Sequence, residues 1–163
     1  TYWRAEAVDE TDVVRFGTYG RGIWDYLLDP PTAGKWTRYG ENLSGANILD
    51  LEATSIPNIG FHQSLELSDA NTAAPGWVQV GSARAEFPFA GGTLLVLPEP
   101  LQQGNTTRLP FMTDALGRAS IGFDIPNDVA WVGRTLTHQA LVRDALMPQG
   151  LARSNGLEMT VGY

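Results

Sequence analysis

A turn signal followed by a strict alternation of apolar and polar residues marks the middle of the C-terminal half. Asp114 has a side chain that hydrogen-bonds its own backbone in turns, and Gly117 adopts positive φ without steric cost. The alternation that follows runs up to Pro126 and predicts a half-buried strand. Its inward residues are Ala119, Ile121, Phe123 and Ile125. None of these side chains is chemically reactive, so the stretch favours assembly or binding over catalysis.

Similar short alternations recur along the chain, with turn residues between them. The expected strands from residue 48 onward are 48–54, 61–68, 77–80, 83–89, 93–97, 106–112, 119–125, 136–142 and 157–161. Residues 93–97 are apolar on both faces, which predicts a central strand. Strands at roughly ten-residue spacing are typical of a sandwich. We therefore predict an all-β protein, an antiparallel β-sandwich of Ig-like or jelly-roll-like type with an N-terminal β-strand arm.

The chain divides into three predicted parts. Residues 1–28 contain three strand patterns and form the N-terminal β arm. Residues 29–47 are rich in Pro, Gly, Asn and Ser and are expected to be a linker loop, with a short segment at 35–39 inside it. Residues 48–163 form the sandwich domain. Because the chain begins with Thr rather than Met, we expect a processed chain or a fragment.

Composition narrows the classes of partner. The net charge is −7, and Lys35 is the only lysine in 163 residues, which argues against binding to nucleic acid or to an anionic membrane surface. No apolar run approaches the ~20 residues of a membrane span. Cysteine is absent, so disulfides and thiolate metal sites are excluded.

Residues 13–28 resemble the closing strands of β-propellers of the Asp-box and sortilin type. The motif that carries this resemblance is the run RFGTYGRGIW at 15–24, since such propellers end their last blade with Thr-x-Gly-Arg-Gly-x-Trp. The motif covers only the arm, so the activities of propeller enzymes are not implied for the whole chain.

Residues 48–163 resemble a family of C-terminal β-sandwich domains of large secreted bacterial proteins. The motifs that carry this resemblance, in order, are GGTLLV at 91–96, TDALGRA at 113–119, IPND at 125–128, QALV at 139–142 and SNGL at 154–157. The resemblance implies a non-catalytic, extracellular or cell-surface module without a cofactor.

Candidate chemical groups are few and scattered. His62 lies on the polar face of its strand and is expected in solvent, whereas His138 aligns with apolar residues and is expected in the core with a satisfied hydrogen bond. The run 154–156, Ser-Asn-Gly, is interpreted as a hairpin turn rather than a nucleophile site. Acidic residues at 9–12 and at Asp124 and Asp128 could bind calcium, but their spacing matches no recognised calcium loop, which favours solvated turns. We predict no enzyme.

Aromatic residues are the remaining candidates. In the arm, the expected assembly residues are Trp3, Phe16, Trp24 and Tyr26. These residues need a neighbouring sheet, because exposed strand edges and large apolar residues promote pairing. The expected function is a self-assembling structural module, filament-forming by strand donation, or a surface attachment module, with a homo-oligomer or polymer as partner. Trp36 and Trp131 could instead stack on a surface glycan, as in a carbohydrate-binding module. A C-terminal fragment of a secreted propeller hydrolase is the third alternative.

Overall fold

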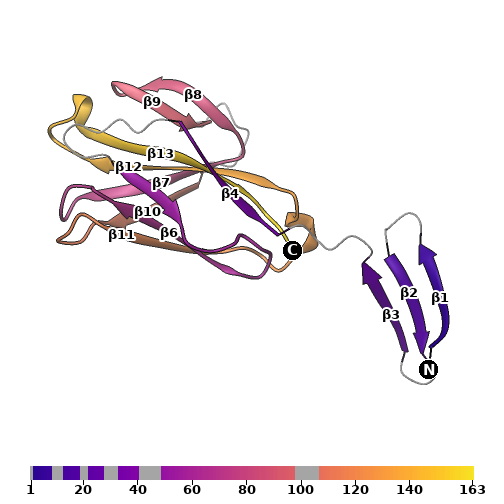
Figure 1. Cartoon of the computed structure of the whole chain (residues 1–163). Coiled ribbons are helices and arrows are strands. Elements are labelled where there is room, and N and C mark those ends of the chain that lie inside the picture. The colour runs from indigo at the N-terminus through magenta and orange to yellow at the C-terminus, as the bar shows by residue number, and fades with distance from the viewer. Residues whose placement is uncertain (1, 9–12, 19–21, 28–32, 41–48, 98–106) are drawn as a thin grey trace. The chain divides into compact units, whose positions relative to one another are not determined.

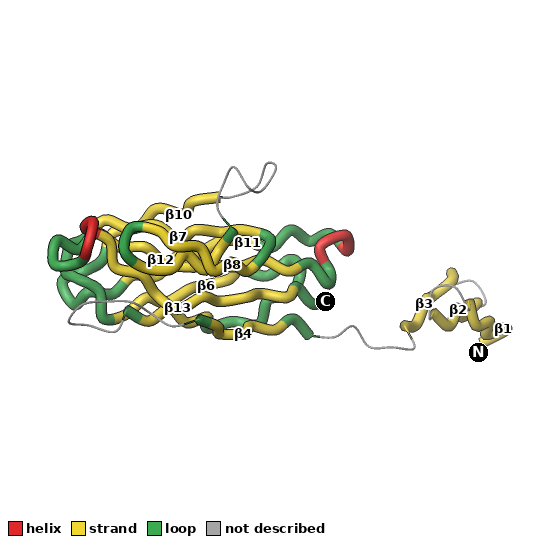
Figure 2. The backbone as a smooth tube through the Cα atoms, turned by 90° about the horizontal axis from the view of Figure 1, so that it is seen from above, coloured by secondary structure: helices red, strands yellow, loops and turns green. Residues whose placement is uncertain are grey.

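The computed structural model describes residues 2–8, 13–18, 22–27, 33–40, 49–97 and 107–163, with only the backbone described in the first three ranges. Residues 1–32 and 33–163 form two compact units, which we call the N-terminal and C-terminal units. The described elements are antiparallel strands apart from two 3-10 turns, η1 (Val129–Trp131) and η2 (Pro148–Gly150), at opposite ends of the C-terminal unit (Figure 2). The predicted all-β class is therefore confirmed. Within the described ranges no helix has the length and apolar character that crossing a membrane requires.

The N-terminal unit is one antiparallel sheet of order β1-β2-β3 (Figure 1). Its strands are β1 (Tyr2–Val8), β2 (Val13–Thr18) and β3 (Gly22–Leu27). These bounds match the three strand patterns that the sequence predicts for residues 1–28. The register is regular except for a shift between Tyr2 and Arg4 on β1.

The C-terminal unit is built on a five-stranded antiparallel sheet of order β10-β7-β12-β13-β4. Its strands are β4 (Lys35–Tyr39), β7 (Pro75–Gly81), β10 (Thr107–Met112), β12 (Thr135–Arg143) and β13 (Leu151–Thr160). The long central pair, β12 and β13, is buried along most of its length. Strands β10 and β4 form the two edges of this sheet.

Two smaller sheets complete the C-terminal unit. A three-stranded sheet has the order β11-β6-β5, with β11 (Ala119–Asp124), β6 (His62–Ser68) and β5 (Asp50–Ala53). The third sheet is a hairpin of β8 (Arg84–Phe89) and β9 (Gly92–Val96). Figure 1 shows this hairpin beside β13 and β12, away from β6 and β11.

One buried cluster joins the five-stranded and three-stranded sheets. Its members from the three-stranded sheet are Leu51, Leu65, Leu67 and Ile121, and those from the five-stranded sheet include Val78, Ala140, Val142 and Leu157. Each fully buried leucine contributes about 1.5–3 kcal/mol, so this shared core is the main attraction between the sheets. The strand pairings do not by themselves distinguish an Ig-like from a jelly-roll-like sandwich, so that arrangement stays a prediction.

The turn before β11 forms as its sequence predicts. The Asp114 carboxylate accepts hydrogen bonds from the backbone N–H of Leu116 (2.8 Å) and of Arg118 (2.9 Å). These bonds lower the pKa of Asp114 below its usual range. Gly117 has a φ of +71°, and an added Cβ would lie 2.0 Å from the backbone oxygen of Ala70. Only glycine fits this position without displacing the loop.

The boundary predicted at residue 48 needs correction. Residues 35–39 were assigned to the linker, but they form β4, which pairs with β13 over residues 156–160. The C-terminal unit consequently starts at Ala33. The segment is short, polar and flanked by turn residues, so its strand character depends on a partner about 120 residues away.

The hairpin turn predicted at residues 154–156 is also wrong, because these residues lie within β13 and are buried. Their polar side chains form hydrogen bonds with backbone groups that would otherwise pair with a neighbouring strand. Asn155 accepts a hydrogen bond from the Leu51 N–H (2.9 Å) and donates one to the Leu51 carbonyl (3.0 Å). Asn155 thereby links β13 to the three-stranded sheet in the way that a neighbouring strand would.

Strand β9 was expected to be central, but among the described residues it pairs only with β8. Its apolar residues are nevertheless buried. Side chains satisfy its free backbone edge: Leu95 N–H donates to Oε1 of Gln139 (2.9 Å), and the Tyr39 hydroxyl donates to the Leu95 carbonyl (2.8 Å). The apolar run on both faces thus reflects packing on the five-stranded sheet, not a central position.

Candidate functional site

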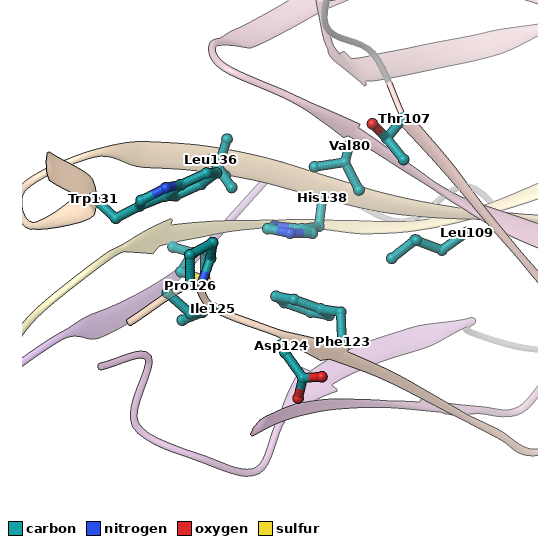
Figure 3. A pocket seen from close by; sticks show the side chains of 11 residues that line it. Val80, Thr107, Leu109, Phe123, Asp124, Ile125, Pro126, Trp131, Leu136 and His138 are labelled. Atoms are coloured by element: carbon teal, nitrogen blue, oxygen red, sulfur yellow. The ribbon is translucent and has the colours of Figure 1, made fainter. Parts of the chain in front are cut away.

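A pocket of about 170 Å³ lies between the five-stranded sheet and β11 (Figure 3). Its wall is largely apolar and includes Val80, Leu109, Phe123, Ile125, Trp131, Leu136 and Met159. An outer hollow of about 490 Å³ shares Val80, Thr107, Trp131 and Leu136 with this pocket. The pocket is therefore built from five strands and one loop that the sequence alone could not bring together.

Trp131 is positioned by the η1 turn. The Asp128 carboxylate accepts a hydrogen bond from the Ala130 N–H (2.9 Å) and so caps the turn. Arg134 donates from Nε to the Ala130 carbonyl (2.8 Å), and its guanidinium carbon lies 5.1 Å from the centre of the Trp131 ring. The half-buried indole thus lines the pocket with a guanidinium group over its ring, where the cation and the ring face attract each other.

His138 is the one buried titratable group in the described pocket lining. Its ring stacks on Phe123, with centroids 5.7 Å apart, and contacts Trp36 at 5.3 Å. Burial lowers the pKa of His138 to about 4, while a contact with the Leu157 backbone acts in the opposite direction. The imidazole is therefore neutral near pH 7. Its predicted core position is correct, but Nδ1 has no hydrogen-bond partner in the described part of the chain.

Polar groups at the pocket are few. Asp124 lines it and accepts a hydrogen bond from Nδ1 of His62 (2.7 Å), and both of these side chains are exposed. His62 is thus on the surface, as predicted. Asp128 is engaged at η1, and the described residues contain no group of three or more His, Cys, Asp or Glu that could hold a metal ion. The acidic residues at 9–12 lie outside the described residues.

Trp36, the other candidate for glycan stacking, lies on β4 with one ring face toward the interior. Its indole N–H donates to the Ser55 carbonyl (2.9 Å), and the half-buried ring packs against both buried clusters. Trp36 therefore closes the core beside His138. It contacts His138 but is not itself among the residues that line the pocket with Trp131.

The assembly candidates are brought together on β1–β3. Phe16 is opposite Trp24 in register, and Val14 is opposite Tyr26. Residues directly opposite each other, and residues two apart along a strand, share one face. Phe16, Trp24 and Tyr26 thus lie on the same face, whereas Trp3 lies at the register shift of β1.

The opposite face of this sheet carries charged residues together with the apolar residues Val8, Val13, Ile23 and Leu27. Arg15 on β2 is opposite Glu6 on β1 and Asp25 on β3, so residues of opposite charge are paired across all three strands. Such cross-strand pairs favour this register over a shift by one residue. The N-terminal unit consequently has one apolar face rich in aromatic residues and one face on which charged and apolar residues are mixed.

Sequence reasoning missed a buried arginine. Arg153 on β13 is almost fully buried, and its guanidinium donates to the carbonyls of Phe89 (2.5 Å) and Ala90 (2.8 Å) in the β8–β9 turn. Burial lowers its pKa. An arginine just before the Ser-Asn-Gly run gave no sequence signal for this role, because its acceptors are backbone carbonyls more than 60 residues away.

Comparison of the chain with protein-family models, with curated proteins and with solved structures found no match. The two resemblances seen in the sequence therefore stay predictions. The function has to be argued from the geometry of the two units.

Proposed function

We propose that the chain is a non-catalytic, extracellular structural module that self-assembles through its N-terminal unit. The observation that carries this proposal is the register of β1–β3, which gathers the aromatic residues on one face of this single sheet and every charged residue of its paired positions on the other, mixed face. The apolar face carries Ala5, Ala7, Val14, Phe16, Trp24 and Tyr26. The extracellular location rests on the resemblance of residues 48–163 to domains of secreted proteins.

The physical argument is that an apolar sheet face needs a second layer. Burying a large apolar side chain is worth about 1.5–3 kcal/mol, so covering Phe16, Trp24 and Tyr26 together would release several kcal/mol. Strands β1 and β3 are the edges of the sheet and present backbone groups to which a neighbouring strand can pair. A second copy of the same unit supplies both the apolar layer and the strand edges.

The symmetry of the contact decides what assembles. If two copies use the same surface reciprocally, the product is a closed dimer; if one copy inserts into a different surface of the next, the product is a ring or a filament. Strand donation of the second kind is the mode that we favour. With strand donation, the mass of the assembly increases with protein concentration.

The test compares two neighbouring residues on opposite faces of β3. We expect the intact chain to exceed its monomer mass of 17.7 kDa in light scattering at tens of micromolar. Trp24→Thr, on the face with the aromatic residues, should return the mass to that of a monomer, whereas Ile23→Thr, on the mixed face, should leave the assembly intact. A wild-type chain that stays monomeric over the whole concentration range would refute the proposal. So would equal behaviour of the two variants.

Two alternatives have specific support. A propeller blade is an antiparallel meander, and the order β1-β2-β3 fits the end of one; in a propeller hydrolase the apolar face would be covered by the preceding blade. The glycan-binding alternative is supported by Trp131 at the outer hollow. Hydrolysis of glycosides by the isolated chain would favour the first, and glycan-array binding lost in Trp131→Ala would favour the second.

A further inference from the structure

We propose that the pocket beside His138 is a binding site for a small neutral aromatic alcohol of about the size of phenol. This site lies in the C-terminal unit and does not depend on assembly through the N-terminal unit. Figure 3 shows the imidazole of His138 reaching from β12 into the space bounded by Leu136, Ile125 and Phe123. The proposal rests on the size of the pocket, on its apolar lining and on this buried ring.

The volume sets the size of the ligand. An apolar cavity of about 150 Å³ binds one benzene molecule, and the pocket measures about 170 Å³. One aromatic ring with a single substituent fills that space. A larger ligand would have to extend into the outer hollow past Trp131.

The lining sets the chemistry of the ring. Phe123 and Trp131 offer aromatic surfaces, and Leu109 and Met159 offer aliphatic and thioether contacts. Aromatic pairs and sulfur–aromatic contacts each add about 0.3–1.5 kcal/mol beyond the burial of apolar area. A flat apolar ring should therefore bind to this wall more tightly than a sugar, which would bury several hydroxyl groups against apolar side chains.

His138 sets the polar group. A neutral imidazole carries one donor and one acceptor nitrogen, and a hydroxyl group can pair with either. Nδ1 is buried without a partner in the described residues, and an unpaired buried polar atom costs about 1–3 kcal/mol. Nδ1 is closed off from solvent, so the imidazole has to turn to present it, and a ligand hydroxyl group that then pairs with Nδ1 removes this cost.

Charge excludes ionic ligands. The Asp124 carboxylate lines the pocket and would repel a phenolate or a carboxylate. A cation could pair with Asp124 only at the rim, where this side chain is 83% exposed, and would lose its hydration against the apolar wall beside His138. The ligand is therefore neutral at the pH at which it binds.

The test uses phenol and toluene, which have nearly the same shape and differ in the hydroxyl group. We expect titrations followed by NMR on the intact chain to show shifts in the resonances of His138, Phe123 and Trp131 with both compounds. Because the toluene methyl group gains from burial about as much as a hydroxyl group gains from one hydrogen bond, the hydrogen bond is measured as the ratio of the phenol and toluene affinities, which should be about five-fold higher in the wild type than in His138→Phe. The same ratio in both proteins, or no binding of either compound, would overturn the proposal.

Two variants separate the polar contact from the cavity. His138→Phe keeps an aromatic ring but removes both nitrogen atoms, so it should lower the ratio of the phenol and toluene affinities while toluene still binds. Leu109→Phe narrows the pocket and leaves His138 in place, so it should weaken both ligands together. If Leu109→Phe leaves both affinities unchanged, the compounds bind elsewhere and the proposal is wrong. That variant decides the question even if His138→Phe fails to fold.

Discussion

His138 stacks on Phe123 with ring planes 19° apart, and Trp36 contacts the same imidazole at an angle of 60°. The three rings come from β12, β11 and β4, so they tie both sheets and the edge strand to one buried polar side chain. Phe123 and His138 also line the pocket. The stability of the core and the properties of the pocket therefore both depend on the His138 imidazole.

Acid should destabilise the C-terminal unit through His138. In the folded state the pKa of His138 is lowered to about 4, whereas an unfolded histidine titrates near 6.5. Between these values the unfolded chain binds a proton that the folded chain does not, so stability is fully present above about pH 6.5 and is lost as the pH falls toward 4. The total loss is about 3 kcal/mol.

Denaturant unfolding at several pH values from 4 to 8 measures this loss. The control is His138→Phe, which should lack the part of the pH dependence that lies between 4 and 6.5. The exposed variant His62→Gln should retain it. Identical pH profiles for wild type and His138→Phe would contradict a buried neutral imidazole.

Two glycines with positive φ should respond differently to alanine. Gly117 has a φ of +71° and an added Cβ would meet the Ala70 oxygen, whereas Gly133 has a φ of +77° with nothing within 4 Å of an added Cβ. Gly133→Ala should cost about 1 kcal/mol from backbone strain alone. Gly117→Ala should cost at least about twice as much, because the clash adds to that strain. Thermal unfolding checks the order, and equal losses would mean that the turn at 117 relaxes freely.

The parts of the fold that sequence predicts are those decided by local chemistry. The Asp114 and Gly117 turn and the inward face of β11 follow from turn residues and a period of two. Strand β4 was missed because it is an edge strand whose order comes from pairing with β13. The Asn-Gly pair at 155–156 was misread because a strong local turn signal is overridden by long-range pairing inside β13.

In the candidate sites, too, the sequence predicts local features but not contacts between distant strands. Sequence placed His138 on an apolar face, but its stacking on Phe123 and Trp36 depends on how three distant strands meet. Trp3, Phe16, Trp24 and Tyr26 were predicted as assembly residues because they are large apolar residues in arm strands that need a neighbouring sheet. The common face of Phe16, Trp24 and Tyr26 required the register of β2 and β3, which no local pattern fixes.

Asn155 should be hard to replace. Its amide both accepts from the N–H and donates to the carbonyl of Leu51, so Asn155→Leu keeps the volume but leaves two buried backbone groups unpaired. Each such group costs about 1–3 kcal/mol, and we expect a total loss of roughly 3 kcal/mol. Asn127→Leu at an exposed loop position is the control and should change stability by less than about 0.5 kcal/mol. Denaturant unfolding that gives similar values for the two variants would show that Asn155 does not link the sheets.

Arg153 should hold the β8–β9 hairpin on the five-stranded sheet. Arg153→Lys keeps the charge, but one ammonium nitrogen cannot replace two guanidinium nitrogens, of which Nη2 donates to the Phe89 and Ala90 carbonyls and Nη1 to the Leu151 carbonyl (3.3 Å). We expect a loss of roughly 2 kcal/mol and faster hydrogen exchange for the amides of β8 and β9.

Arg84→Lys provides the matched control for Arg153→Lys. Arg84 makes a two-point pair with Glu158, with Nε–Oε2 and Nη2–Oε1 distances of 2.7 Å, and this pair lowers the pKa of Glu158. The Arg84 side chain is 44% exposed, so solvent screening should limit the cost of its replacement to less than about 1 kcal/mol. If Arg153→Lys is no more damaging than Arg84→Lys and the exchange rates of the hairpin are unchanged, then apolar packing of Leu94, Leu95 and Val96 holds the hairpin instead.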